Sequence, residues 1–191
     1  MNKPDTKLKD FIHVERGVIP SDICEFIIKD VETRSWQPHF WSNAYGKSIE
    51  KVYNRELDIQ FFNEKLQELL SPFILECGKL YNRQYSYSNA QQIMYTFGNI
   101  RFNRYAPGQI MRQHIDHIHD IFDGKVKGVP VLSFILNFND DYEGADLYFW
   151  EDTVVKLGKG DIVMFPSNFL FPHGVTEATK GKRYSGVTWA W

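Results

Sequence analysis

The chain has 191 residues, a formal net charge of −2 and an aromatic content of 16%. This length suits one domain with a full hydrophobic core, and the aromatic residues argue against disorder and indicate a thick, partly β core. A near-neutral charge provides no global basic field for a nucleic-acid backbone, so no nucleic-acid partner is expected.

The N-terminal residues are polar and lack an apolar signal core, and no stretch approaches the roughly 20 apolar residues of a membrane span. We therefore expect a cytoplasmic protein without a membrane partner. Two cysteines, Cys24 and Cys77, are too few for a disulfide framework and lie in no Cys/His cluster, so both are expected to be buried, reduced thiols.

The first ninety residues predict an edge strand and two helices. Residues 11–19 alternate as an edge strand does, and a helix begins after Pro20 with Ser21 or Asp22 as its N-cap. The apolar face expected for this helix consists of Ile23, Phe26, Ile27 and Val31. Residues 36–60 are rich in aromatic and polar side chains without a sustained period, which favours loops with one or two short strands.

A second helical pattern begins at Asn63 and has an apolar side chain at every third or fourth position: Leu66, Leu69, Leu70, Phe73, Cys77 and Leu80. Pro72 interrupts this pattern. Either the helix kinks there, or Ser71 caps a new helix with Pro72 at its first position.

After Tyr81 the pattern changes to short strands separated by turn residues. The predicted strands are 92–96, 99–106, 110–116, 129–138, 145–150, 153–157, 161–165, 171–176 and 182–190. The eight strands from residue 99 onward suit a double-stranded β-helix, the jelly roll that cupins also use. We therefore expect a mainly β protein whose N-terminal helices brace the jelly roll, with residues 1–191 as one domain: 1–95 for helical support and substrate loops, and 96–191 for the catalytic core.

A metal site is indicated by His114 and Asp116. Side chains two apart in a strand point the same way, so both can bind one metal ion while Ile115 faces elsewhere. With a distant third ligand such as His173, two imidazoles and a carboxylate would occupy one face of an octahedron, as in non-haem Fe(II) oxygenases. His117 has the opposite parity and His119 is expected in a loop, so we interpret both as neighbours of the site.

His173 alone could equally be a hydrogen-bonded core histidine, and Arg183 alone could be a surface charge beside a turn. Arg183 follows ten residues later, and a hairpin of that length is expected to return the next strand beside His173. The sequence after Arg183 reads as buried, which favours an interior guanidinium able to pair with a carboxylate.

From about Tyr95 onward the chain resembles the Fe(II)/2-oxoglutarate-dependent dioxygenase superfamily, and within it the prolyl 4-hydroxylase-like branch. The matching features, in order, are Tyr105, His114-Ile-Asp116, Leu132–Asn137, Glu143-Gly144-Ala145, Gly160–Phe165, His173, Arg183 and Trp189. One departure is Glu143-Gly144-Ala145, where the family usually has two adjacent glycines; Gly144 can still make the turn.

The resemblance implies that His114, Asp116 and His173 bind Fe(II). It further implies that Arg183 pairs with the distal carboxylate of 2-oxoglutarate and that Tyr105 donates a hydrogen bond to it. Ser133 is expected to assist from a neighbouring strand. Ser185 and Trp189 share the face of Arg183 and would line the pocket floor, although core packing explains Trp189 almost as well.

The expected function is hydroxylation of a substrate C–H bond with O2, with release of succinate and CO2 and with ascorbate as a possible further cofactor. A prolyl residue in a peptide or protein is the favoured substrate, and a small molecule or free amino acid is the alternative. The rivals from other classes are a non-catalytic jelly-roll binding module and a cupin-like isomerase or hydrolase. A lid is expected at residues 117–128 or 36–53. The sequence does not indicate an oligomeric state.

Overall fold

The computed structural model describes residues 6–42, 48–49, 56–86, 91–116, 122–123 and 127–191. Its core is a double-stranded β-helix, in which a seven-stranded and a four-stranded antiparallel sheet enclose a hydrophobic interior. The predicted mainly β jelly roll with N-terminal helices is confirmed. None of the described helices is long and apolar enough to cross a membrane.

The seven-stranded sheet has β17 at its centre. In spatial order its strands are β1 (His13–Glu15), β14 (Ile162–Pro166), β10 (Leu132–Asn137), β17 (Arg183–Ala190), β6 (Arg101–Tyr105), β5 (Asp58–Gln60) and β2 (Gln37–Pro38). The four-stranded sheet consists, in order, of β13 (Thr153–Val155), β12 (Leu147–Phe149), β15 (His173–Val175) and β7 (Met111–His114). Strands β1, β2 and β5 show that the N-terminal residues supply both edges of the larger sheet.

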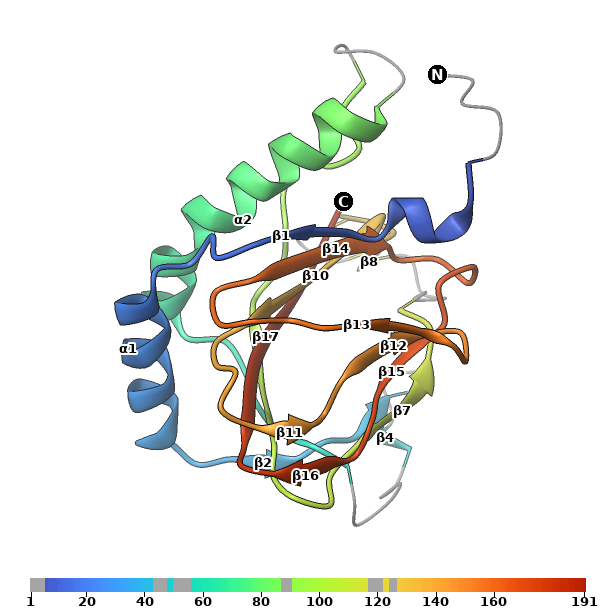
Figure 1. Ribbon diagram of the computed structural model, residues 1–191. Coiled ribbons are helices and arrows are strands. Elements are labelled where there is room, and N and C mark those ends of the chain that lie inside the picture. The colour runs from blue at the N-terminus through green and yellow to red at the C-terminus, as the bar shows by residue number, and fades with distance from the viewer. Residues whose placement is uncertain (1–5, 43–47, 50–55, 87–90, 117–121, 124–126) are drawn as a thin grey trace.

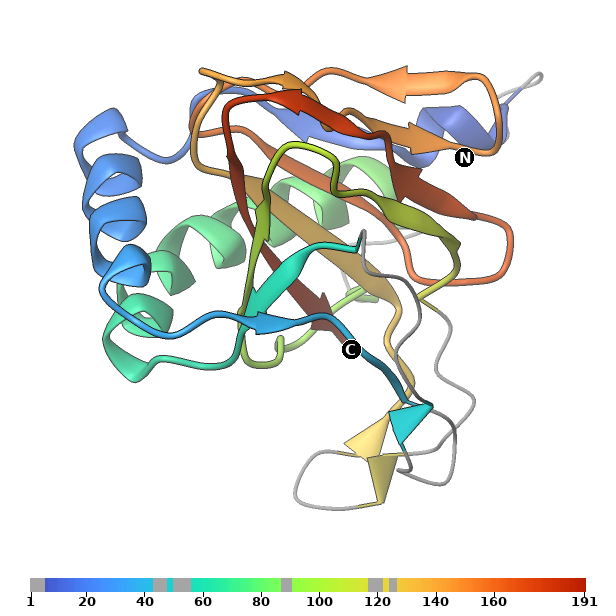
Figure 2. The same ribbon diagram turned by 90° about the horizontal axis from the view of Figure 1, so that it is seen from below.

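Three two-stranded sheets complete the strands in the described part of the chain. They are β11 (Glu143–Gly144) with β16 (Ala178–Lys180), β3 (Trp41–Ser42) with β4 (Ser48–Ile49), and β8 (Phe122–Asp123) with β9 (Lys127–Gly128). Figure 2 shows the β3–β4 and β8–β9 pairs projecting from the same side of the molecule.

All eight strands predicted from residue 99 onward form, although most are shorter at their ends than predicted. The strand predicted at 92–96 is wrong. The amide of Ile93 instead donates to the side chain of Asn82 on the second helix (2.8 Å), and Phe97 forms only an isolated bridge to Ala190. The predicted edge strand 11–19 is confirmed in part: only β1 forms, at the edge of the large sheet.

Helix α1 (Ser21–Glu32) follows a short 3-10 helix at Leu8–Phe11. The predicted N-cap is wrong by one residue, because the carbonyl of Pro20 accepts the first helical hydrogen bond from Cys24 (3.0 Å) and no side chain caps the helix. The buried face contains Cys24, Ile27 and Val31. Phe26, predicted to be buried, is 38% exposed and packs beneath the ammonium group of Lys65.

Helix α2 (Glu64–Tyr85) runs without interruption through Pro72, so a new helix capped by Ser71 does not form. The helix begins one residue after the predicted start at Asn63, and the side chain of Asn63 caps it by accepting a hydrogen bond from the amide of Leu66. The hydroxyl of Ser71 donates to the carbonyl of Gln67 in the turn before the proline (2.6 Å).

Because successive side chains of a strand point to opposite faces, the large sheet contributes to two hydrophobic cores. Leu132, Phe134 and Leu136 of β10 point outward and pack with side chains of α1 and α2, which cover the outer face of the large sheet (Figure 1). The residues between them point into the jelly roll, where Ile135 joins side chains of both sheets. Cys24 and Cys77 are buried free thiols of the outer core, as predicted, and burial raises the pKa of Cys24 to about 11.

The predicted hairpin between His173 and Arg183 is wrong. Strand β15, with His173, pairs with β12 and β7, whereas β17, with Arg183, crosses to the other sheet and pairs with β10 and β6. The short strand β16 between them pairs with β11, which turns the chain from one sheet to the other. His173 and Arg183 therefore come from opposing sheets.

Candidate metal and anion site

His114, Asp116 and His173 form a cluster that could hold a metal ion. His114 ends β7, Asp116 follows it, and His173 lies opposite His114 where β15 pairs with β7. The Nε2 atoms of His114 and His173 lie 3.4 and 3.7 Å from the Asp116 carboxylate oxygens Oδ1 and Oδ2. One ligand atom from each residue lies within 4.8 Å of the others. The parity argument for His114 and Asp116 thus agrees with the structure.

Backbone carbonyls fix both imidazole rings. The Nδ1 atom of His114 donates to the carbonyl of Arg112 (2.8 Å), and Nδ1 of His173 donates to the carbonyl of Phe171 (3.0 Å). Each ring therefore carries its proton on Nδ1 and presents the lone pair of Nε2 to the cluster. Such outer hydrogen bonds orient histidine ligands in metal sites.

The ionisation states also suit a divalent cation. Burial lowers the pKa of His173, which packs against Phe149 and Phe165, so its imidazole is neutral near pH 7. Burial alone would raise the pKa of Asp116, but His173 and His114 hold it well below its usual range. Two imidazoles and one carboxylate are the protein ligands of a facial-triad iron site, so the donor set fits Fe(II).

Ser133 lies beside this cluster. Its hydroxyl donates to Oδ2 of Asp116 (2.7 Å) and is within 2.6 Å of the Ser167 hydroxyl. The structure therefore places Ser133 at the carboxylate of the cluster, whereas the sequence had suggested contact with a cosubstrate. Ser167 was not predicted.

Arg183 is a buried cation on the inner face of β17, with 1% of its surface exposed. Its Nε donates to Oδ1 of Asn137 (2.9 Å), its Nη1 donates to the carbonyl of Ala145 (2.9 Å), and its guanidinium lies 5.5 Å from the ring centroid of Tyr105. All of these partners are neutral groups. No carboxylate in the described part of the chain pairs with it, which leaves a buried positive charge suited to an anionic ligand.

Ala145 has a left-handed backbone conformation (φ 49°), immediately after Gly144 (φ 73°). This is the position where the sequence departs from the usual glycine pair. A left-handed conformation costs a residue with a Cβ about 1–2 kcal/mol, and glycine avoids this cost. In this conformation the carbonyl of Ala145 points toward Arg183 and accepts a hydrogen bond from its Nη1.

We therefore expect Ala145→Gly to raise the melting temperature by about 2–4 °C, which corresponds to about 1 kcal/mol for a protein of this size. Thermal unfolding followed by circular dichroism measures the change. Gly144→Ala is the matched control and should lower the melting temperature, because its Cβ would lie 2.1 Å from the carbonyl oxygen of Glu177. A lower melting temperature for Ala145→Gly would contradict the inference that the backbone of Ala145 is strained.

The other predicted pocket residues share the inner face of the large sheet. Tyr105 lies opposite Arg183 in the pairing of β6 with β17, and burial raises its pKa, so its hydroxyl stays protonated. Ser185 is buried two residues further along β17. Trp189 lies opposite Ser133, and its indole Nε1 is buried without a hydrogen-bond partner in the described structure.

Two groups at this site were not predicted. Arg101 is on the same face of β6 as Tyr105, and its guanidinium lies 5.5 Å from the ring centroid of Trp189. The second is a buried chain of charges in which Glu56 contacts Nδ1 of His39 (2.8 Å) and Nε of Arg112 (2.7 Å). Burial opposes ionisation of Glu56, but His39 and Arg112 hold its pKa below the usual value.

The contacts of Glu56 connect the N-terminal half of the protein to the cluster of His114, Asp116 and His173, because the carbonyl of Arg112 also accepts the hydrogen bond of His114. Strand parity could have identified Arg101 from the sequence, because it lies four residues before Tyr105. The ion pairs of Glu56 could not be identified in this way, because its partners are distant in the sequence. His117 and His119 lie outside the described residues, as does much of each predicted lid.

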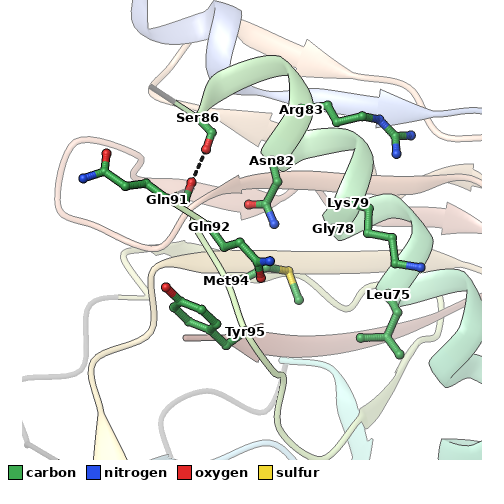
Figure 3. Close-up of a pocket in the computed structure, with 10 residues that line it drawn as sticks. All are labelled: Leu75, Gly78, Lys79, Asn82, Arg83, Ser86, Gln91, Gln92, Met94 and Tyr95. Atoms are coloured by element: carbon green, nitrogen blue, oxygen red, sulfur yellow. Dashed lines mark hydrogen bonds between the residues drawn. The ribbon is translucent and has the colours of Figure 1, made fainter. Parts of the chain in front are cut away.

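A separate pocket of about 320 Å³ lies between α2 and residues 91–95 (Figure 3). Figure 3 shows Met94 pointing toward the helix at Gly78 and Tyr95 at the rim. The described lining residues include no histidine, cysteine or carboxylate, and Asn82 is already engaged by the backbone of Ile93. These residues therefore do not provide the groups that metal or acid–base chemistry requires.

Comparison with known proteins finds similarity in the C-terminal half of the chain. Residues 100–191 match the model of the 2OG-Fe(II) oxygenase superfamily. A "PKHD-type hydroxylase" of Caulobacter vibrioides is 34% identical over 94 residues, which cover 46% of this chain and 40% of the relative. The chain thus spans about 40% of the length of the curated relatives it matches.

Two solved structures share the fold at low sequence identity. The viral collagen prolyl hydroxylase of Paramecium Bursaria Chlorella virus-1 has a TM-score of 0.68 at 16% identity, with 94% of each chain covered. A Trichoplax adhaerens prolyl hydroxylase, solved with a hypoxia inducible factor peptide fragment, has a TM-score of 0.68 at 16% identity and covers 95% of this chain and 83% of its own. Both place the whole described chain in one known architecture.

Proposed function

We propose that this chain is an Fe(II)- and 2-oxoglutarate-dependent dioxygenase of the prolyl 4-hydroxylase-like branch, because residues 100–191 match the model of the 2OG-Fe(II) oxygenase superfamily. In this proposal residues 1–191 act as one catalytic domain that hydroxylates a substrate C–H bond. The observation that carries it is the convergence of His114, Asp116 and His173 within 4.8 Å, in the same jelly roll as a buried Arg183 that has no carboxylate partner in the described part of the chain.

In the proposed site His114, Asp116 and His173 hold Fe(II) on one face. The bound metal, with 2-oxoglutarate and O2, supplies the oxidising chemistry that inserts oxygen and releases succinate and CO2. Arg183 binds the distal carboxylate of 2-oxoglutarate, and the Tyr105 hydroxyl donates to the same group. Ascorbate is proposed as a further cofactor that keeps the metal reduced.

The remaining groups orient these ligands. Asn137 and Ala145 hold the guanidinium of Arg183 so that its remaining donors are available to a carboxylate. Ser133 fixes one oxygen of Asp116 and leaves the other for the metal. Ser185, two residues from Arg183 on β17, lines the wall beside the cosubstrate. Trp189 lines the same face further along β17, opposite Ser133.

A prolyl residue in a peptide or protein is the proposed substrate. The support is the likeness of the fold to prolyl hydroxylases, one of them solved with a peptide fragment. A free amino acid or another small molecule is the second candidate, favoured by the additional cation Arg101 on the inner face.

The proposal is tested with the full chain, Fe(II) and 2-oxoglutarate, by measuring succinate with and without proline-rich peptides. We expect slow succinate formation without peptide, faster formation with a substrate, and a product heavier by one oxygen atom in mass spectrometry. Calorimetry with Mn(II) in place of Fe(II) measures 2-oxoglutarate binding independently of turnover. Absence of metal-dependent 2-oxoglutarate binding would instead favour a non-catalytic jelly-roll binding module.

A further inference from the structure

Arg101 is a second cation on the inner face of the large sheet. It lies on β6 opposite Val187 of β17, and it shares parity with Asn103 and Tyr105. Arg183 lies opposite Tyr105 on the same strand pair. The inner face of these two strands therefore presents one guanidinium near each end.

The guanidinium of Arg101 has few partners. Its Nε donates to Oδ1 of Asn103 (3.1 Å), and its plane lies 5.5 Å from the ring centroid of Trp189. Within the described residues Arg101 makes no salt bridge, and neither of its terminal amino groups meets an acceptor. Arg101 is partly buried, and this burial lowers its pKa.

Comparison with a neighbouring arginine shows that the lack of a carboxylate partner is a property of the inner face. Arg104, on the outer face of β6, pairs with both Asp58 (2.9 Å) and Glu32 (3.0 Å). On the inner face both Arg101 and Arg183 lack such carboxylates in the described structure. Because a desolvated cation without a counter-ion is costly, two of them on one face indicate two anionic groups among the ligands.

Trp189 adds a second donor to the Arg101 end. Its indole Nε1 is buried and has no acceptor among the described groups, while its ring packs against Arg101. A buried donor without a partner is uncommon in native structures and calls for an acceptor from a ligand. A carboxylate could accept from both the indole and the guanidinium.

The distal carboxylate of 2-oxoglutarate is not the group that Arg101 and Trp189 would bind. In the proposed function both ends of 2-oxoglutarate have partners, because Arg183 binds its distal carboxylate and its 2-oxo acid end would lie at the metal held by His114, Asp116 and His173. Arg101 lies at the other end of the strand pair from Arg183, opposite Val187. It is therefore left for another anion, on the same side of the site as Asp116, whose charge acts on it.

We propose that Arg101 and Trp189 bind a carboxylate of the substrate, and thereby determine specificity for substrates that carry one near the reacting carbon. This inference rests on the proposed oxygenase function. The carboxylate belongs either to a free amino acid or to an acidic or C-terminal residue of a peptide. A guanidinium presents the planar pair of donors that a carboxylate accepts.

The test compares probes that differ only in a carboxylate. The pairs are N-acetyl-L-proline with N-acetyl-L-prolinamide, and the capped peptides acetyl-Gly-Pro-Glu-amide and acetyl-Gly-Pro-Gln-amide. Calorimetry measures their binding to the full chain loaded with Mn(II) and 2-oxoglutarate. We expect the carboxylate member of at least one pair to bind at least about tenfold more tightly, because charge-assisted hydrogen bonds are stronger than neutral ones. The pair that discriminates identifies the source of the carboxylate.

Arg101→Gln should reduce this discrimination to within about twofold, and Arg101→Lys should retain part of it through its charge. Arg83→Gln, at an exposed arginine on α2, is the matched control and should change nothing. In all three variants the affinity for 2-oxoglutarate should stay within about twofold of wild type, since Arg101 is not assigned to the cosubstrate.

Equal binding of both members in every pair would overturn the inference, and so would a large loss of 2-oxoglutarate affinity in Arg101→Gln. Failure of the broader proposal is distinguishable, because it appears in the unmutated chain as missing 2-oxoglutarate binding before any probe is added.

Discussion

Asp116→Asn should reduce succinate formation to about one hundredth of wild type or less. Asparagine keeps the size of the side chain but removes the negative charge from the His114, Asp116 and His173 cluster. Loss of a partner outside the ligand sphere commonly costs 10–100-fold in metal affinity or activity, so loss of a ligand should cost at least as much. Mn(II) binding followed by electron paramagnetic resonance measures the metal directly, and a succinate assay with excess Fe(II) measures turnover.

The control for this experiment is Asp152→Asn, which changes an exposed carboxylate and should leave both measurements unaltered. His173→Ala should have the same effect as Asp116→Asn, since it removes a second ligand. If Asp116→Asn bound Mn(II) as tightly as wild type, the cluster would not be the metal site. A far-UV circular dichroism spectrum establishes that each variant is folded.

Arg183→Gln should weaken 2-oxoglutarate binding by about 100-fold while leaving Mn(II) affinity unchanged. Truncating one member of a buried, hydrogen-bonded charge pair costs about 2–5 kcal/mol, and each 1.4 kcal/mol corresponds to a factor of ten. Glutamine can still occupy part of the volume near Asn137 and Ala145, but it carries no charge. Calorimetry with the Mn(II)-loaded protein measures the dissociation constant.

Arg183→Lys separates charge from geometry. Lysine keeps the positive charge but lacks the planar fork, so its affinity should fall between those of wild type and Arg183→Gln. The same titration on Arg101→Gln serves as the matched comparison within the pocket and should give the wild-type value. An unchanged dissociation constant in Arg183→Gln would make Arg183 a structural residue that only links Asn137 to Ala145.

Much of the fold follows from local sequence patterns. The strands from residue 99 onward were predictable because short strand-like runs are separated by turn residues, among them several glycines. His114 and Asp116 were predictable as a pair because side chains two apart in an extended segment point the same way, although β7 itself ends at His114. The grouping with His173 and Arg183 came from the order and spacing of residues in a known family.

Other features depended on distant partners and could not be predicted. The segment 92–96 alternates like a strand, but Asn82 of α2 takes one of its amides. The crossing from β15 to β17 was mistaken for a hairpin because the intervening β16 pairs with β11, far away in the sequence. Phe26 fits the apolar helical period, yet the buried face of α1 contains Cys24, Ile27 and Val31 and leaves Phe26 at the surface.

The central position of β17 has a consequence for the order of folding. This strand follows both β10 and β6 in the sequence, yet it lies between them and so divides the larger sheet into two groups of three strands. These groups cannot be joined until β17 has been synthesised. Contacts between such distant segments form slowly, so the interior should close late in folding. Removal of residues 183–191 should leave two unjoined three-stranded sheets that expose hydrophobic edges.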